Sequence, residues 1–268
     1  MLRFLTAVFI ITQFFGPMAW ALDLQAHRAI YALELGRARA GSGVADASGR
    51  LVVEFNNQCE GTVFTQRIVS RIQDADGGFS VTDSSTSSWE ASDGLSYRFM
   101  SRQSVDGELQ DETDGSAELE SKGGRGDAVF NSPKGRKVSL AKGTIFPAEF
   151  NTRVVEAALR GEKRVDLTLF DGSADVDVYH ALATIGPEQA PGKVKAAGGN
   201  AGTLVNTQKS WIVAVAYYRP NESEGLPDYE VTFRMFPNGI AGDLTIDYGD
   251  FSLHGRLTRV DRLTKPRC

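Results

Sequence analysis

The sequence predicts a mainly β protein in which one large antiparallel sheet curls around a single principal α-helix. Apolar and polar residues alternate through most of the chain beyond residue 21, and this period of two is typical of half-buried strands. Asp-Gly pairs separate several of these segments, and such pairs favour tight hairpin turns. One segment breaks the alternation with helical spacing. A barrel or an open curled sheet around that helix accommodates this order, and a compact sandwich fits the same alternation.

The first 21 residues have the features of a secretory signal peptide. Arg3 provides a positive start, residues 4–15 are largely apolar, and Ala19 and Ala21 are the small residues that a signal peptidase reads. We expect cleavage after Ala21. A membrane anchor is the alternative, but the apolar stretch is shorter than the ~20 residues that span a bilayer as a helix. The mature chain, 22–268, is expected to be one water-soluble domain exported to the cell envelope.

The half of the chain up to residue 122 is predicted to form a meander of long hairpins. A strand opens at His27 and places Ala29, Tyr31 and Leu33 on one face. Further strands are predicted at 50–57, 62–73, 78–90, 95–105 and 107–119. The turns between them carry Asp76-Gly77, Asp93-Gly94 and Asp106-Gly107.

The one predicted helix covers residues 147–160. Pro147 suits the first helical position, Glu149 lies in the first turn, where negative charge is favourable, and Gly161 follows the end. The apolar residues at helical spacing are Phe150, Val154, Ala157 and Ala158. Strands are predicted to resume at 163–170, 175–185, 208–218, 228–236, 240–248 and 251–263, and the Gly-, Ala- and Pro-rich stretch 186–202 is expected to be a flexible loop.

The charge balance argues against nucleic acid as a partner. The chain has 29 Lys and Arg against 34 Asp and Glu, and loss of the leader removes only Arg3, which leaves a net charge of -6 on the mature chain. Phosphate backbones require a clustered basic face. No cofactor is expected either, because the glycines around Arg125 lack the dinucleotide and P-loop fingerprints and are interpreted as a turn. The same turn contains Arg125-Gly126-Asp127, a three-residue match that we attribute to chance.

The residues that could support catalysis form no recognisable motif. His27, His180 and His254 occur singly on predicted strands, outside any metal-binding spacing, and Gly-x-Ser-x-Gly is absent. The serine-rich run 84–88 is interpreted as the polar part of a strand. Three aspartates between Asp171 and Asp177 could attract Ca²⁺, but the EF-hand spacing is missing, and a hairpin turn is the simpler explanation. We therefore expect a non-enzymatic protein.

Several aromatic residues lie on predicted strands, where about half of the side chains point inward. They are Trp89, Tyr97, Phe99, Trp211, Tyr217, Tyr218 and Tyr229. Core packing accounts for all of them. The alternative is that Trp89, Tyr97, Phe99, Trp211 and Tyr217 line an apolar cavity inside the curled sheet.

The two cysteines are Cys59 and Cys268, the last residue of the chain. In an oxidising compartment the default expectation is one disulfide bond between them, with two free thiols or intermolecular pairing as alternatives. The residues are too far apart in sequence for a Cys-x-x-Cys redox pair.

Three features together resemble the EipB family of cell-envelope integrity proteins. They are the opening strand 26–35, the segment Phe55-Asn56-Asn57-Gln58-Cys59-Glu60-Gly61, and the terminal Cys268. The resemblance runs over the whole mature chain. It implies a periplasmic β-spiral with a disulfide between Cys59 and Cys268, similar to the carriers that move lipoproteins across the periplasm.

The resemblance also implies a role without a defined reaction. It suggests a factor that maintains envelope integrity through protein contacts, with a periplasmic tetratricopeptide-repeat protein as the partner. The alternative is a carrier that binds a lipid, an acyl chain or a lipoprotein in the curled sheet, and it rests on analogy of fold.

Overall fold

The computed structural model describes residues 22, 24–173, 176–192, 198–220 and 225–268. The expected leader, 1–21, and its cleavage site lie outside the described residues. Fifteen strands, one α-helix and one short π-helix make up the described chain. The strands of the first half are β1 (His27–Ala38), β2 (Val44–Asn57), β3 (Gly61–Asp74), β4 (Phe79–Ala91), β5 (Ser96–Val105), β6 (Glu108–Leu119), β7 (Gly126–Ser132) and β8 (Lys137–Leu140).

The second half begins with β9 (Thr144–Ile145), directly followed by the helix α1 (Pro147–Leu159). The remaining elements are β10 (Arg164–Leu169), β11 (Tyr179–Ile185), the π-helix η1 (Gly202–Asn206), β12 (Trp211–Tyr218), β13 (Tyr229–Met235), β14 (Ala241–Asp247) and β15 (Phe251–Arg262). The prediction placed no strand at β7, β8 or β9, and it expected a loop where η1 begins. β8 and β9 have only four and two residues, so alternation within them was too brief to recognise.

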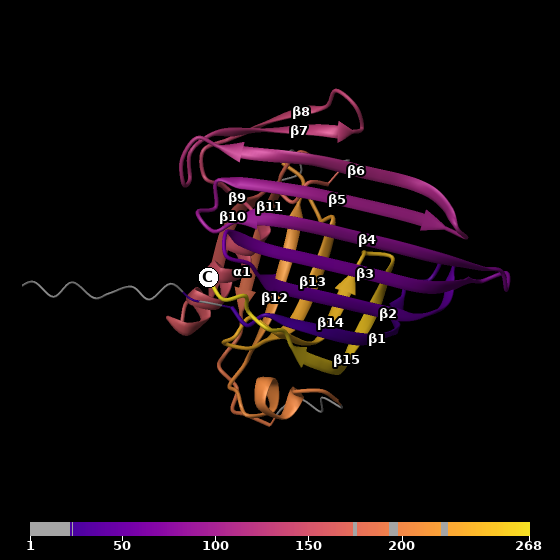
Figure 1. Ribbon diagram of the computed structural model, residues 1–268. Coiled ribbons are helices and arrows are strands. Elements are labelled where there is room, and N and C mark those ends of the chain that lie inside the picture. Colours follow the sequence, from indigo (N-terminus) through magenta and orange to yellow (C-terminus); the bar gives the residue numbers. More distant parts are fainter. Residues whose placement is uncertain (1–21, 23, 174–175, 193–197, 221–224) are drawn as a thin grey trace, which may run out of the picture.

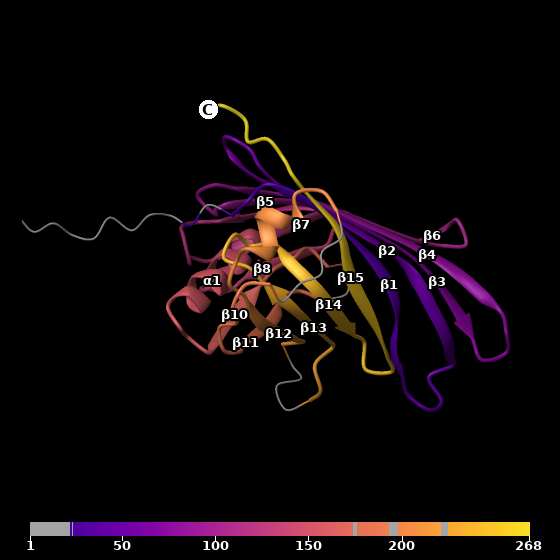
Figure 2. The ribbon, with the colours of Figure 1, turned by 90° about the horizontal axis from the view of Figure 1, so that it is seen from below.

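All fifteen strands belong to one sheet, in the order β8-β7-β6-β5-β4-β3-β2-β1-β15-β14-β13-β12-β11-β10-β9. The two termini of the described chain meet at the centre, where β1 pairs with β15. Neighbouring strands are antiparallel except β9 and β10. The sheet curls so that β1 to β6 cross over β10 to β15, with α1 at one end (Figure 1; Figure 2). The predicted curled antiparallel sheet with one principal helix is confirmed.

The Asp-Gly pairs do mark hairpin turns. Asp106 and Gly107 join β5 to β6 with φ angles of 53° and 85°, a left-handed conformation that glycine and aspartate tolerate best. β2 starts earlier than expected, at Val44, because the alternation before Arg50 is interrupted by small and polar residues. Strand bounds elsewhere agree within a few residues.

Helix α1 begins at Pro147, as predicted, and ends at Leu159. Gly161 follows with a φ of 78° and lets the chain turn away. The face that carries the apolar residues is buried: Phe150, Val154, Val155, Ala157 and Ala158. They pack against β9 to β13 in the largest core cluster. Helical spacing in the sequence therefore identified both the helix and its core face.

Two further clusters complete the core. One joins β1, β2, β14 and β15 beneath η1, whose Leu204 and Val205 are buried. The other lies on β5 to β8 and receives Phe146 and Phe170. These two rings follow β9 and β10 in the chain, and both are fully buried. The edge strands of the sheet are β8 and β9, and we call the junction between these two edges the seam. Phe146 and Phe170 fill the seam, so the sheet closes there by side-chain packing instead of strand pairing.

The expected disulfide bond is present. Cys59, in the turn between β2 and β3, is bonded to Cys268, and their Cα atoms are 5.5 Å apart. The bond ties the C-terminal segment after β15 to the first half of the sheet. No helix among the described residues has the length and apolar character needed to cross a membrane.

Candidate functional site

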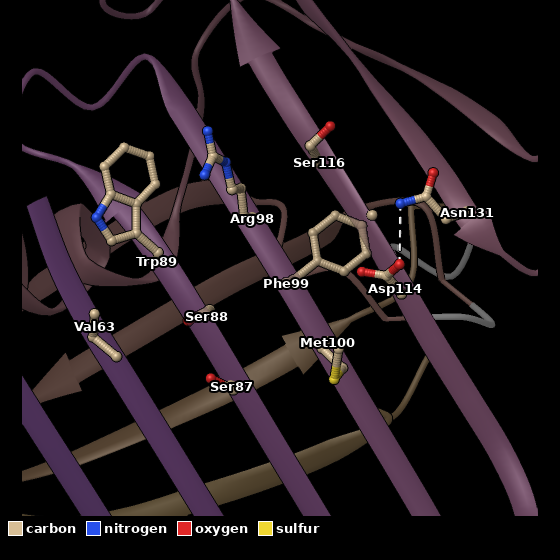
Figure 3. A pocket seen from close by; sticks show the side chains of 11 residues that line it. Val63, Ser87, Ser88, Trp89, Arg98, Phe99, Met100, Asp114, Ser116 and Asn131 are labelled. Atoms are coloured by element: carbon tan, nitrogen blue, oxygen red, sulfur yellow. Dashed lines mark hydrogen bonds between the residues drawn. The ribbon is translucent and has the colours of Figure 1, made fainter.

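A shallow hollow of about 520 Å³ lies on the convex face of β3 to β7 (Figure 3). Its walls are side chains that alternate away from the core: Val63, Ser87, Trp89, Arg98, Met100, Asp114, Ser116 and Asn131. Ser88, Phe99 and Gly115 complete its lining. We call this feature the convex-face hollow.

Register across the sheet brings these residues together. Trp89 pairs with Val63 on one side and with Arg98 on the other. Arg98 pairs in turn with Ser116. One row therefore runs across four strands, and a second row joins Ser87 to Met100 and Asp114. The hollow lies between these rows because cross-strand partners point to the same face.

Trp89 is the central side chain of the convex-face hollow. The Arg98 guanidinium lies 5.2 Å from the centre of its ring, in a cation–π arrangement. Gly61 is required beneath it, because a Cβ at Gly61 would lie 2.8 Å from the indole nitrogen. The ring is thus held in place by a glycine on one side and a cation on the other.

The convex-face hollow also contains a carboxylate, Asp114, that offsets the charge of Arg98, and one exposed apolar side chain, Met100. Asn131 donates a hydrogen bond to the Asp114 carboxylate over 3.0 Å (Figure 3). Met100 is 48% exposed. Tryptophan, methionine and arginine are enriched in protein interfaces, and tryptophan and arginine dominate their binding energy.

The other aromatic residues proposed for a cavity occupy different positions. Tyr97, Phe99 and Trp211 are each less than 5% exposed and lie in the packed core. Tyr217 is half-buried on the inner side of β12, where its ring stacks on Tyr229 with centroids 4.4 Å apart. Burial raises the pKa of both phenols, so they stay protonated. Trp89 and Phe99 both line the convex-face hollow, but only the Trp89 ring points away from the interior, because the Phe99 side chain is buried in the core.

The three histidines lie on separate strands, β1, β11 and β15. His27 is buried against Phe55, and burial lowers its pKa. His180 contacts Asp166 on the exposed face of β10 and β11. His254 lies between Glu34 and Thr245 on neighbouring strands.

The row of Glu34, His254 and Thr245 contains the residue types of a catalytic triad. The Thr245 hydroxyl is 3.4 Å from the same imidazole nitrogen, Nδ1, that an orienting carboxylate would need. Glu34 makes no hydrogen bond to His254 among the described residues. The row is therefore a set of neighbours on a sheet face, without the geometry that activates a hydroxyl.

The aspartates singled out as a possible Ca²⁺ site are engaged within the protein where they are described. Asp171 accepts a hydrogen bond from the backbone of Ser173, and Asp177 pairs with Arg136 at 2.9 Å. Residues 174–175 lie outside the described residues. Within the described ranges no group of three or more acidic, histidine or cysteine side chains is placed to hold a metal ion.

Sequence reasoning singled out Trp89 but placed it inside the curled sheet, whereas it lies on the outer face, and it missed the neighbours that surround Trp89 there. A usable signal existed, because Trp89 and Arg98 are equidistant from the Asp93-Gly94 turn, and a two-residue hairpin pairs such positions. The same symmetry pairs Ser87 with Met100. Asn131 had no such signal, since it belongs to β7, a strand that the sequence did not predict.

The fold defines the chain as a β-barrel-like protein made from one curled sheet. A solved β-barrel-like protein of a domain of unknown function from Brucella abortus superposes on it with a TM-score of 0.82 and 36% identity, over 91% of this chain and 100% of that one. The EipB-like family model matches residues 18–264. The cell envelope integrity protein EipB of Brucella abortus (strain 2308) is 38% identical over 248 residues, which cover 91% of this chain and 86% of the relative. The chain belongs to the EipB-like family, whose name indicates a role in cell-envelope integrity.

Proposed function

We propose that this chain is a non-enzymatic periplasmic factor that maintains cell-envelope integrity through contacts with other proteins. The observation that carries the proposal is the convex-face hollow, where Trp89, Arg98 and Met100 form a partly exposed cluster of residue types that are enriched in protein interfaces. Family membership supports the envelope role. A periplasmic tetratricopeptide-repeat protein is the partner that the family resemblance suggests.

The arrangement of the hollow fits a protein partner better than a small substrate. It is open and shallow, so a small molecule would keep much of its surface in water, whereas enzyme and cofactor sites bury most of the ligand. Its rim carries both signs of charge, Arg98 and Asp114, which supply specificity at an interface edge. Met100 adds an adaptable apolar contact.

Crosslinking in cells tests the proposal. Wild-type protein should capture a defined set of envelope proteins, and the double variant Arg98→Glu/Met100→Glu should lose the main one. The control Arg164→Glu/Leu226→Glu changes one exposed arginine and one exposed apolar residue elsewhere, and Leu226 is 80% exposed. An unchanged set of captured proteins in the hollow variant would remove the hollow from the proposal. Capture of no envelope protein by the wild type would remove protein contact as the mechanism.

A second candidate function is a carrier for a lipid, an acyl chain or a lipoprotein inside the curled sheet. The observation in its favour is a set of apolar side chains on the inner face that pack on the core yet remain partly exposed. They are Phe64, Tyr217, Tyr229 and Phe233. An acyl chain laid over them would remove this surface from water, at about 25 cal/mol per Å².

Lipid extraction and native mass spectrometry test the carrier. A carrier should be recovered with lipid in a fixed ratio, and Val231→Asp, on the inner face of β13, should abolish that binding. Thr232→Asp, the adjacent residue on the opposite face, is the matched control. Recovery of lipid-free wild-type protein from membranes that supply lipid would contradict this candidate.

A further inference from the structure

A second hollow, of about 580 Å³, lies on the convex face of β2 to β4, and arginines surround it. Arg50, Arg67 and Arg71 form its rim, and Val52, Val69 and Val81 form its apolar lining. We call it the arginine hollow. Although the whole chain carries a net negative charge, three cations are gathered here on one face of the sheet.

Register explains the clustering. Arg50 pairs with Val69, the residue midway between Arg67 and Arg71 on β3. Arg50 is therefore the diagonal neighbour of both, at a residue separation of about 7–8 Å. Like charges at this spacing repel one another in the unliganded protein, and an anion placed between them relieves the repulsion.

The guanidinium groups are held in position by different partners. Arg67 donates two hydrogen bonds to the Asp83 carboxylate, at 2.9 and 2.6 Å. Arg71 lies over the ring of Phe79, 4.0 Å from its centroid. Neither Arg50 nor Arg71 has an acidic partner within the described ranges. The rim therefore keeps two uncompensated cations, one of them already oriented by an aromatic ring.

The surroundings favour an anion that carries an apolar portion. The valine lining offers nothing to a free phosphate ion but contacts a hydrocarbon well. Phe79, on the same convex face and next to Arg71, is 60% exposed. An exposed aromatic ring beside arginines is the combination that proteins place at the boundary between lipid headgroups and acyl chains. Asp83 is engaged by Arg67, and Glu34 lies one strand beyond Ser48 at the margin.

We infer that the arginine hollow binds the phosphate of an anionic phospholipid headgroup, with Arg50 and Arg71 as the principal contacts and Phe79 at the acyl boundary. The site lies on the opposite face of the sheet from the interior that the carrier function would use. It would hold the protein at a membrane surface without a membrane-spanning segment. It goes beyond the proposed function, which requires only protein contacts.

Vesicle cosedimentation of the oxidised mature chain tests the inference. Wild-type protein should bind vesicles of pure phosphatidylglycerol and should not bind vesicles of pure phosphatidylcholine. Arg50→Gln/Arg71→Gln should weaken binding roughly 30-fold, since each arginine near an anionic surface contributes about a factor of five. Salt should weaken wild-type binding too. Because the chain is acidic overall, unspecific charge attraction would have the wrong sign.

The control Arg160→Gln/Arg164→Gln removes the same charge from exposed positions beside α1 and β10 and should bind as the wild type does. Equal weakening in both double variants would overturn the site. Absence of vesicle binding by the wild type, or equal binding to both lipids, would overturn the inference. Binding of inorganic phosphate, without binding to phosphatidylglycerol vesicles, would identify a free anion as the ligand and exclude the lipid headgroup.

Discussion

Glu90 of β4 caps helix α1 from across the fold: its carboxylate oxygen lies 2.7 Å from the backbone nitrogen of Ala148. The other oxygen accepts a hydrogen bond from the backbone N–H of Glu149, at 3.0 Å. Phe146, at the position where a capping side chain normally stands, makes no such bond. A residue 56 positions earlier in the chain therefore satisfies the first free N–H groups of the helix.

The Glu90 contact predicts a pH-dependent stability. Burial raises the pKa of the carboxyl group from 4.5 to about 7, and the nearby Glu149 carboxylate acts in the same direction, while the two N–H groups and Lys122 oppose the change. Between these pH values the folded protein keeps a proton that the unfolded chain has released. The proton retained on Glu90 therefore stabilises the folded state. This stabilisation is complete below pH 4.5 and is lost as the pH rises through 7, and the free energy of unfolding falls by about 3 kcal/mol in all.

Urea unfolding of wild type and Glu90→Gln as a function of pH measures this effect. As the pH rises, the free energy of unfolding of the wild type should fall relative to that of Glu90→Gln, because the glutamine is uncharged at every pH. Glu54→Gln, on the convex face of β2, provides the baseline for loss of a partly exposed carboxylate. A wild-type profile parallel to that of Glu90→Gln would show that Glu90 does not titrate with folding.

Loss of the disulfide bond should destabilise the protein strongly. Cys59 and Cys268 are separated by 209 positions, and the chain-entropy model gives about 5 kcal/mol for closing a loop of that length. Cys59→Ser/Cys268→Ser should therefore unfold at a much lower urea concentration than the oxidised wild type. The reduced wild type should match the double variant. If oxidised and reduced wild type unfold together, the bond contributes nothing to stability.

Phe170 should be among the most sensitive core positions. Its ring lies within 6.4 Å of the rings of Tyr97, Phe99, Phe130 and Phe146, so it joins the end of β10 to the opposite edge of the sheet. Phe170→Ala should lower the free energy of unfolding by about 3–5 kcal/mol. Leu226→Ala, at a position that is 80% exposed, should change it by less than about 0.5 kcal/mol. Chemical denaturation of both variants decides whether packing holds the seam.

Gly172 should resist any side chain, for two separable reasons. Its φ is 83°, and a Cβ there would lie 2.4 Å from the ring of Phe99. Gly135 has nearly the same φ, 84°, with open space around it. Gly135→Ala should cost about 1 kcal/mol for the backbone alone, and Gly172→Ala should cost about 1–3 kcal/mol more for the displaced ring. Equal losses in thermal unfolding would contradict the packing role.

Local rules were sufficient for the long strands and the α-helix of the fold. Alternation predicted the long strands, Asp106-Gly107 predicted a left-handed hairpin turn, and Pro147 with the spacing of Phe150 and Val154 predicted the helix. These features depend on residues within one turn or one pleat of each other, so the local sequence pattern is enough to predict them. The strands β8 and β9 failed this rule, because four and two residues carry too little pattern, and the seven-residue β7 was missed as well.

The placement of side chains relative to the core required the tertiary structure. Trp89 and Glu90 are adjacent in a serine-rich strand, yet one lines a surface hollow and the other is buried against α1. Alternation says that they face opposite sides and does not say which side is covered. That choice depends on where the helix docks, which is a long-range packing event.

The sequence by itself determined the strand-rich curled architecture, the helix, the cysteine bond and membership of the EipB-like family. Only the tertiary structure decided how the sheet closes and where its functional surfaces lie. Phe146 and Phe170 close the seam, and Arg50 meets Arg67 and Arg71 through strand register. Both outcomes depend on contacts between residues far apart in the chain. The energy of such contacts comes from packing and charge in three dimensions, and local periodicity does not predict it.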